Sequence, residues 1–188
     1  MMRMRRILGK WSIVCGLVLA CCALAFHSSV SAGHKALQGE VGPGTRKEVE
    51  QELRGFAKEI SRKAPLNNET AFVLLTDYLR KNPLDYGAAF AFAPKKEGGK
   101  LIKSSPYVFR RGEELIKKDL MESYDYTASS QKWYVVPVKQ KKAYWSEPYY
   151  DEGGGNAWMV TYSIPIYSAG KHRRLIGVVT SDVLISKQ

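Results

Sequence analysis

The feature that most constrains the fold of this chain is a change in hydrophobic periodicity at Pro83. Before Pro83, apolar residues recur every three or four positions, which is the spacing of one face of a helix. They form two series on either side of Ala64-Pro65: Val49, Leu53, Phe56 and Ile60, then Phe72, Leu75 and Leu79. After Pro83 the apolar stretches are short and bounded by glycine and proline, which is typical of strands. The sequence therefore predicts two helices followed by a set of strands.

Local signals mark the ends of both predicted helices. Thr45 and Glu48 have the spacing of a capping box, in which each side chain accepts a backbone N–H at the start of a helix. The second helix is predicted to begin near Asn67 or Asn68, because asparagine favours the N-cap. It is predicted to stop before Pro83, because proline cannot continue a helix.

Five strands and one short helix are predicted beyond Pro83. The strands cover residues 86–93, 101–111, 133–138, 157–167 and 175–185, and the helix covers 113–121. Pro106 interrupts the second strand and places it at an edge or at a bulge. Lys95 to Lys100, with Gly98-Gly99, and Ser168 to Lys171 predict hairpin turns. Helices followed by strands in hairpin order predict an α+β fold with an antiparallel sheet.

The first 32 residues have the pattern of a secretory signal peptide. A basic start is followed by an apolar stretch over residues 11–26 and by small side chains up to Ala32. An uncleaved signal anchor is one alternative, and a lipid attached to Cys21 is another. All three interpretations place the remainder outside the cytoplasmic membrane, in the periplasm or an equivalent compartment. We expect a flexible lead-in over residues 33–44 and a single domain over 45–188.

Cysteine and charge narrow the class of protein. All three cysteines lie inside the export segment, so the predicted domain has neither a disulfide framework nor a thiolate metal site. The formal net charge of +11 includes four basic residues of that segment, and the other basic residues are spread over turns and helix faces. A solvated surface is the main interpretation, and weak attraction to an anionic membrane is the other. We expect no nucleic-acid partner.

Catalytic motifs are not found, and we expect the chain not to be an enzyme. His27 and His34 precede the predicted domain, and His172 lies in a predicted turn, so no histidine is placed for general-base chemistry or zinc. The sequence also has no Gly-x-Ser-x-Gly and no P-loop. We expect neither a metal nor a cofactor.

Several segments in one order resemble the Cache sensor domain. Trp133-Tyr134 is followed by residues 144–156 (YWSEPYYDEGGGN), 159–165 (MVTYSIP) and 176–183 (IGVVTSDV), and residues 86–92 (YGAAFAF) are similar to its first central strand. This domain forms the extracytoplasmic part of many chemoreceptors, sensor kinases and membrane-bound serine phosphatases. The resemblance is to the membrane-distal half of the double form. It implies a PAS-like fold: a long N-terminal helix, a five- or six-stranded antiparallel sheet and flanking helices.

The resemblance also implies a binding pocket. In the amino-acid-binding branch of double Cache sensors, the ligand is held by a tyrosine, an Arg-x-Trp pair, a Tyr-x-Asp pair and a late aspartate. Gln131 occupies the arginine position here, and Lys132 is expected on the opposite face of the predicted strand. Trp145 joins the predicted site, with packing in the core as the alternative. The residues that match the other positions are Tyr126, Trp133, Tyr149, Asp151 and Asp182.

The chemistry of these residues suits a cation. Carboxylates such as Asp151 and Asp182 hold an ammonium group, and aromatic faces add cation–π attraction. A ligand carboxylate favours a guanidinium, which Gln131 does not offer, although Arg110 or Arg111 could supply one. Asp151 could instead stabilise a turn, and a calcium site in its acidic loop is a lesser alternative.

These observations predict a sensor domain that binds a small polar solute: an amine, an amino acid or a carboxylate. The chain stops at Gln188, directly after the last predicted strand, so we expect a membrane receptor or kinase to carry the signal. The alternative is a structural or interaction domain with a vestigial pocket, derived from a truncated receptor.

Overall fold

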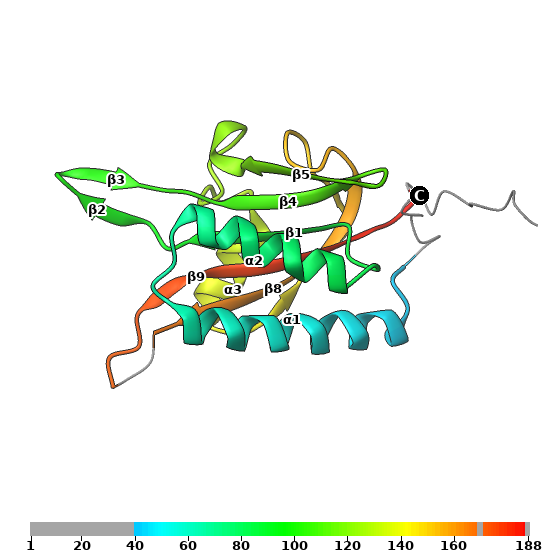
Figure 1. Cartoon of the computed structure of the whole chain (residues 1–188), viewed down its shortest axis with the longest axis horizontal. Coiled ribbons are helices and arrows are strands. Elements are labelled where there is room, and N and C mark those ends of the chain that lie inside the picture. Colours follow the sequence, from blue (N-terminus) through cyan, green and yellow to red (C-terminus); the bar gives the residue numbers. More distant parts are fainter. Residues whose placement is uncertain (1–39, 169–170, 187–188) are drawn as a thin grey trace, which may run out of the picture. The chain divides into compact units, whose positions relative to one another are not determined.

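Helices cover both faces of an antiparallel sheet in the part of the chain that the structure describes, residues 40–168 and 171–186 (Figure 1). The structure is a computed structural model. The predicted export segment and most of the predicted lead-in lie outside the described residues. No helix within the described ranges is both long and apolar enough to cross a membrane.

The elements follow one another in the order helix, helix, strands, helix, strands. They are α1 (Pro43–Lys63), α2 (Asn68–Lys81), β1 (Gly87–Phe92), β2 (Lys95–Glu97), β3 (Lys100–Ile102), β4 (Pro106–Arg111), β5 (Glu114–Asp119), the 3-10 turn η1 (Leu120–Glu122), α3 (Lys132–Gln140), β6 (Tyr144–Trp145), β7 (Tyr149–Tyr150), β8 (Trp158–Tyr167) and β9 (Leu175–Leu184). The main sheet has the order β5-β4-β1-β9-β8-β6, and β7 also pairs with β8. The strands β2 and β3 form a separate hairpin. The predicted α+β class with an antiparallel sheet is confirmed.

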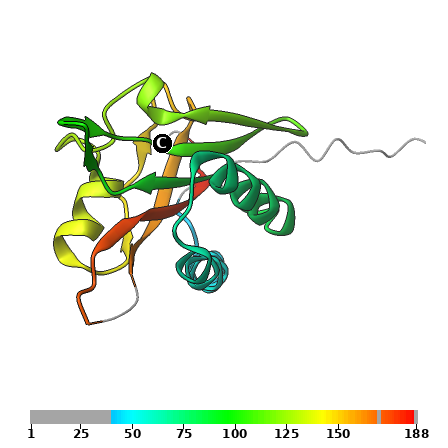
Figure 2. The ribbon, with the colours of Figure 1, turned by 60° about the vertical axis from the view of Figure 1, so that its left-hand side comes forward.

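The sheet divides the core into two clusters. On one face, α1 and α2 bury their apolar stripes against Phe90, Val160 and Val179 (Figure 2). On the other face, α3 and the segments around it cover a cluster that includes Tyr107, Tyr126 and Trp133 (Figure 2). Side chains alternate along a strand, so neighbouring residues of β8 and β9 contribute to opposite clusters. This alternation decides which residues can reach a pocket.

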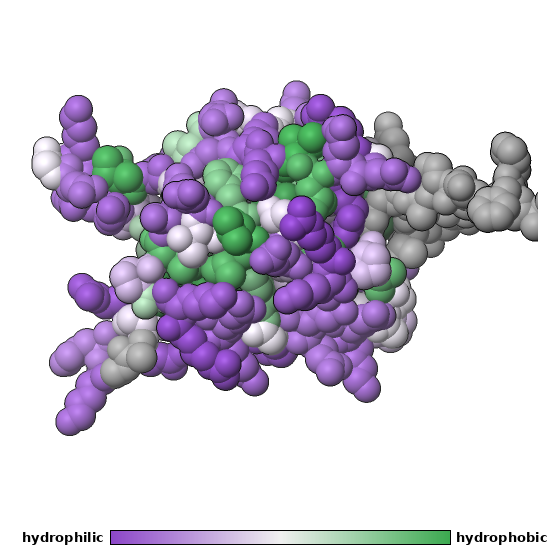
Figure 3. Space-filling view, in the orientation of Figure 1, coloured by the Kyte–Doolittle hydropathy of each residue, from purple (hydrophilic) through white to green (hydrophobic). Residues whose placement is uncertain are grey.

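Helix α1 confirms the predicted apolar stripe but begins earlier than predicted. Val49, Leu53, Phe56 and Ile60 are all buried, and the outward surface along α1 is hydrophilic (Figure 3). The helix starts at Pro43, and its N-cap Gly42 makes no side-chain cap. Proline has a backbone φ suited to the first helical turn, so it sets the start and the predicted capping box at Thr45 is not used. Helix α2 is capped as predicted: Asn67 Oδ1 accepts a 2.8 Å hydrogen bond from the Thr70 N–H.

The predicted helix over residues 113–121 is wrong. Residues 114–119 form β5, which pairs with β4 from Arg111↔Glu114 to Pro106↔Asp119. Gly112, with φ of 61°, makes the turn between these strands. Pairing with β4 supplies backbone partners along the whole segment, and this overrides its local helical propensity. The predicted strand 101–111 is accordingly divided, with β4 beginning at Pro106.

The predicted strand over residues 133–138 is also wrong, because this segment lies in α3. Its buried residues, Trp133, Tyr134 and Pro137, share one face of a helix. The two valines between them favour a strand locally, but the segment has to cover the open face of the sheet. Gln131 is the N-cap of this helix, so the expectation that Gln131 and Lys132 alternate along a strand fails.

Candidate functional site

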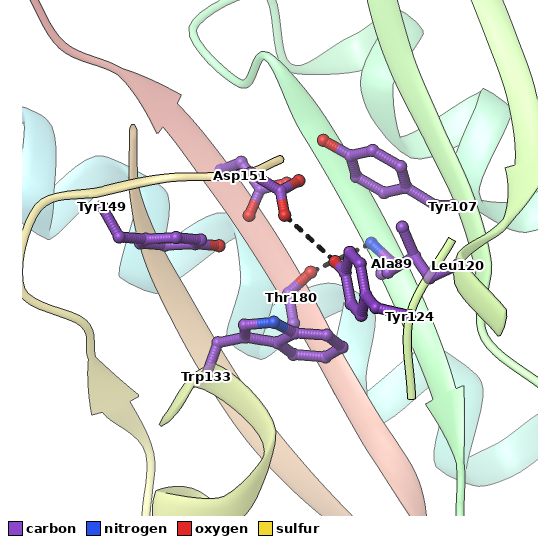
Figure 4. A pocket seen from close by; sticks show the side chains of 9 residues that line it. Ala89, Tyr107, Leu120, Tyr124, Trp133, Tyr149, Asp151 and Thr180 are labelled. Carbon is purple, nitrogen blue, oxygen red and sulfur yellow. Dashed lines mark hydrogen bonds between the residues drawn. The ribbon is translucent and has the colours of Figure 1, made fainter. Parts of the chain in front are cut away.

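A pocket lies on the α3 side of the sheet (Figure 4). Its cavity is small, about 10 Å³, and it is partly open to solvent. Its walls come from β1, β4 and β9, the turn after β5, the start of α3 and the segment after β6. The lining residues are Ala89, Tyr107, Leu120, Tyr124, Trp133, Tyr149, Asp151, Thr180 and Asp182.

Asp182 lies on the floor of the pocket at the centre of the sheet. It pairs with Thr161 in β8 and Gly87 in β1. Thr161 Oγ1 donates a 2.8 Å hydrogen bond to Asp182 Oδ1, and the Tyr149 hydroxyl lies 2.8 Å from Thr161 Oγ1. The one hydroxyl hydrogen of Thr161 goes to Asp182, so Tyr149 donates to Thr161. Burial, together with the nearby charge of Asp151, raises the pKa of Asp182 to about 8.

Asp151 lies in the turn that follows β7. Its Oδ2 accepts a 2.7 Å hydrogen bond from the Gly155 N–H, and its Oδ1 accepts a 3.0 Å hydrogen bond from the Tyr124 hydroxyl (Figure 4). Burial raises the pKa of Asp151, and these hydrogen bonds oppose the rise. A Cβ at Gly154 would lie 2.1 Å from Asp151 Oδ2, so only glycine fits there. Asp151 therefore stabilises its turn and also lines the pocket.

The aromatic walls of the pocket are fixed by their surroundings. Gln131 Oε1 accepts a 3.0 Å hydrogen bond from Trp133 Nε1, which orients the indole from the start of α3. Tyr107 reaches across β1 at Gly87, where a Cβ would lie 2.4 Å from the tyrosine hydroxyl and 2.9 Å from Asp182 Oδ2. The absence of a side chain at Gly87 therefore brings the Tyr107 hydroxyl and the Asp182 carboxyl together on the pocket floor.

Among the described residues that line the pocket, two are acidic and none is basic. Arg110 instead donates from Nε to the Asp85 carbonyl at 3.0 Å and from Nη2 to the Leu79 carbonyl at the end of α2. Arg111 lies over the Phe109 ring, 5.8 Å from its centroid. The nearby Lys118 ammonium donates to the Gly153 carbonyl and the Ser123 hydroxyl, and its charge opposes the rise that burial causes in the pKa of Asp151. The pocket thus offers two buried carboxyls and no guanidinium to a ligand.

The structure brings four of the seven predicted site residues together and places three elsewhere. The four that line the pocket are Trp133, Tyr149, Asp151 and Asp182. Gln131 lies behind Trp133. The Tyr126 hydroxyl donates a 2.6 Å hydrogen bond to the Phe92 carbonyl, and its ring packs edge-on against Tyr134.

Trp145 lies on the opposite face of the sheet, with α1. Its Nε1 donates a 2.9 Å hydrogen bond to Glu50 Oε1, and the Arg46 guanidinium lies 4.9 Å from the ring centroid. Its own ring packs against Tyr162, with 5.0 Å between centroids. These contacts fit the packing alternative for Trp145.

The structure adds pocket residues that the sequence did not single out. Tyr124 occupies the wall, although the resemblance implied Tyr126, two residues later, as the tyrosine of the site. Thr180 could have been found from Asp182, because residues two apart in a strand face the same side. The same rule gives no access to Tyr107 in β4 or to Leu120 in the turn after β5, since the segment that follows β4 was predicted to be a helix.

Comparison with known families identifies the class of protein. A model described as "Methyl-accepting chemotaxis protein-like, first PDC sensor domain" matches residues 73–187. The chain belongs to this family of sensor domains, and the resemblance to the Cache domain is confirmed. A search of curated proteins found no match.

Solved structures support the same fold. The chain is 32% identical to the extracellular domain of the putative histidine kinase soHK1S-Z6, with a TM-score of 0.65, and the match covers 74% of this chain and 53% of that one. A second match is "Methyl-accepting Chemotaxis protein X", at 23% identity and a TM-score of 0.50, covering 73% of this chain and 61% of that one. The ligand-binding domain of the Pseudomonas aeruginosa PAO1 chemoreceptor PctC in complex with GABA matches at 17% identity and a TM-score of 0.50, covering 74% and 56%. The chain spans about half the length of the first of these sensor domains.

Proposed function

We propose that the pocket binds a small organic cation, an amine without a carboxylate, and that the domain senses this solute outside the cytoplasmic membrane. The observation that carries the proposal is the pair of buried carboxyls, Asp151 and Asp182, in a described wall without a basic side chain. Burial and mutual repulsion raise the pKa of Asp182. A cation placed between the two carboxyls relieves this repulsion and favours their ionised forms, which a neutral solute does not do.

The other walls suit the same ligand. Trp133, Tyr124 and Tyr149 surround the carboxyls with aromatic rings (Figure 4). A cation over such a face gains about 0.5–2 kcal/mol, depending on how far it is desolvated. The carboxylate of an amino acid finds no arginine or lysine in the described wall, and burying it unpaired is costly. Selection against a ligand carboxylate is therefore part of the proposal.

The domain's context supports a role in signal transduction. The solved relatives are extracellular domains of putative histidine kinases, together with chemoreceptor proteins. We propose that this chain likewise lies outside the cytoplasmic membrane, is exported or anchored by residues 1–32, and passes its signal to a membrane receptor or kinase. We propose no catalytic activity for it.

Thermal unfolding of the full chain with four probes tests the ligand class. Tetramethylammonium and ethylamine should raise the melting temperature, L-alanine should raise it less, and acetate should not raise it. A ligand at 100 times its dissociation constant adds about 2.7 kcal/mol to the free energy of unfolding.

Two variants serve as a matched pair in this experiment. Asp182→Asn keeps the acceptor for Thr161 but loses the charge, so the shift caused by the cations should disappear. Asp77→Asn changes an exposed aspartate of α2 and should leave the shift intact. If acetate raised the melting temperature as much as ethylamine does, the proposal that the pocket selects a cation would be excluded. No shift by any probe would favour the vestigial pocket.

A further inference from the structure

A pair of carboxyls, Glu52 and Asp85, lies where α1 packs against α2, on the face of the sheet opposite the pocket. The two helices lie side by side there, and Phe56 of α1 stacks on Tyr78 of α2 with 4.6 Å between the ring centroids (Figure 2). Glu52 precedes Phe56 by one helical turn and therefore shares its face of α1. Burial raises the pKa of Asp85, and the negative charge of Glu52 adds to this rise. The two carboxyls thus interact across the contact between α1 and the end of α2.

Both carboxyls of this pair have oxygens that water does not reach. Asp85 is fully buried, at 0% exposed. Glu52 is half-buried, but its Oε2 is buried and has no hydrogen-bond partner among the residues that the structure describes. A charged oxygen that has lost water and gained no donor is costly. The fold therefore favours a state in which the pair carries less than two negative charges.

The hydroxyl groups around Asp85 come from α2 and β9. The Tyr78 hydroxyl donates to Asp85 Oδ2, and the Ser181 hydroxyl also interacts with the carboxyl. Both hydrogen bonds oppose the effect of burial on the pKa of Asp85, but the net shift is still upward. These neutral donors hold the carboxyl in place without neutralising its charge.

The charged groups around the pair are mostly negative. Glu48 lies one turn before Glu52 on α1, and its charge adds to the effect of burial in raising the pKa of Glu52. Asp182, on the opposite face of the sheet, also interacts with the charge of Asp85. The nearby cation is Arg110 of β4, which donates to the backbone carbonyl of Asp85 and to the end of α2. Arg110 therefore offsets the charge of Asp85 only in part.

Asp85 changes its charge in the neutral range. Its pKa is raised to about 7, so it passes from about one-tenth ionised at pH 6 to about nine-tenths at pH 8. Ionisation places a buried negative charge opposite Glu52. Asp85 is fully enclosed, whereas Glu52 is half-buried at the edge of the contact. Movement of Glu52 toward solvent, together with its part of α1, is therefore the way to relieve the repulsion.

From these contacts we propose that Glu52 and Asp85 form a second input site of the domain, which takes protons and controls how tightly α1 packs on α2. With one carboxyl neutral the helices pack closely, and with both ionised the middle of α1 loosens. Helix α1 is the first element after the predicted export segment in the chain, so this change acts on the element next to that segment. The site is separate from the pocket and does not depend on what the pocket binds.

Two tryptophans report separately on the two faces of the sheet. The Trp145 indole contacts Glu50 and Arg46 of α1, whereas Trp133 lines the pocket. Fluorine NMR of the full chain labelled with 5-fluorotryptophan follows both between about pH 5.5 and pH 8.5, the range that brackets the titration of Asp85. Trp145→Phe and Trp133→Phe assign the two resonances. Without any ligand, we expect the Trp145 resonance to shift with a midpoint near pH 7.

Variants of the pair test its two members. Asp85→Asn keeps an acceptor for the Tyr78 hydroxyl but does not titrate, so the Trp145 shift should disappear. An unchanged Trp133 resonance at low pH shows that this variant is folded. Glu52→Gln removes the opposing charge, so the shift should become smaller and its midpoint should move to lower pH, since Glu52 raises the pKa of Asp85.

Matched controls change a carboxyl of each helix that lies outside the pair. Asp77→Asn alters an exposed aspartate of α2, and Glu59→Gln alters a glutamate of α1 that pairs with Lys63 at 2.8 Å. Both should leave the Trp145 shift unchanged. Asp182→Asn should also keep this shift, which separates the proton site from the pocket carboxyl.

Three outcomes overturn the proposal. The first is a Trp145 resonance that does not move with pH in the unsubstituted protein. The second is a shift that persists in Asp85→Asn. The third is a shift that is lost in Asp182→Asn but kept in Asp85→Asn, which would assign the pH response to the pocket.

Discussion

Asp182 and Asp85 are both buried and both have a raised pKa, yet they lie in contrasting surroundings. Asp85 lies beside α2, where the Tyr78 hydroxyl donates to its Oδ2 and Arg110 donates to its carbonyl. Asp182 lies on the pocket floor, where the Thr161 hydroxyl donates to its Oδ1, the Tyr107 hydroxyl also interacts with its carboxyl, and the charge of Asp151 is nearby. Protein groups surround Asp85, whereas Asp182 faces a space that a ligand can enter. Burial alone therefore does not mark a binding residue; an open side does.

The largest expected effect is the pH dependence of ligand affinity, which should follow Asp182 and not Asp85. Tetramethylammonium keeps its charge at every pH, so only the protein titrates. Because a cation favours the ionised carboxyl and the pKa of Asp182 is about 8, affinity should rise about tenfold per pH unit up to that value. Isothermal titration calorimetry from pH 6 to pH 9 measures this, and Asp182→Asn should bind weakly at every pH. If the affinity of the unsubstituted protein did not change with pH, Asp182 would not contact the ligand.

A smaller effect is expected at Asp85, where substitution should lower the stability of the fold but not the affinity for the ligand. Asp85→Ala leaves the Tyr78 hydroxyl without its acceptor and should lower the free energy of unfolding by about 1–3 kcal/mol. Urea denaturation measures this loss. Ligand affinity should remain unchanged, because Asp85 does not line the pocket. If Asp85→Ala lowered ligand affinity as well as stability, Asp85 would contribute to the ligand site, contrary to this prediction.

A second variant, Asp85→Asn, tests how the charge of Asp85 contributes to the pH dependence of stability. The pKa of Asp85 is raised to about 7, mainly by burial, so its contribution to stability is full below its unfolded pKa and is lost as pH rises through 7. The slope from one such carboxyl is about 1.4 kcal/mol per pH unit between the two pKa values. Asparagine keeps an acceptor for Tyr78 and does not titrate, so stability should fall less steeply with pH in this variant. An unchanged slope would assign the pH dependence to other carboxyls.

The smallest effect concerns Gln131, which acts through Trp133. Gln131→Leu removes the acceptor of the indole N–H and should weaken cation binding by up to about tenfold, the value of one hydrogen bond. Gln131→Glu keeps an acceptor and should retain affinity. Tryptophan fluorescence reports the freed indole independently of binding. If both variants bind equally well, the hydrogen bond does not position Trp133.

Much of the fold followed from local patterns. The stripe in α1 predicts its buried face because a helix repeats every 3.6 residues whatever surrounds it. The strands β1, β8 and β9 were predicted because their apolar segments, small and aromatic in β1, are bounded by turn residues. Asp182 and the pair Tyr149 and Asp151 lie in extended motifs of the family, and the structure brings them together around one pocket.

Other features were decided only by long-range pairing. Trp145 and Tyr149 are four residues apart, so one continuous strand would place both on the same face. In the structure Trp145 pairs with Tyr162, but Tyr149 pairs with Met159, which shifts the register by one residue between β6 and β7. A shift of one residue exchanges the two faces of a sheet. Trp145 therefore packs with α1 while Tyr149 reaches the pocket.

The sequence by itself determined that two amphipathic helices precede an antiparallel sheet, and which motif carries the carboxyls. Only the tertiary structure decided that residues 114–119 pair as β5, that residues 132–140 close the pocket as α3, and that Tyr124 lines the pocket instead of Tyr126. The physical reason is the range of the interactions. Periodicity and turn preferences act over a few residues, whereas strand partners and the face that a side chain occupies depend on segments far away in the chain.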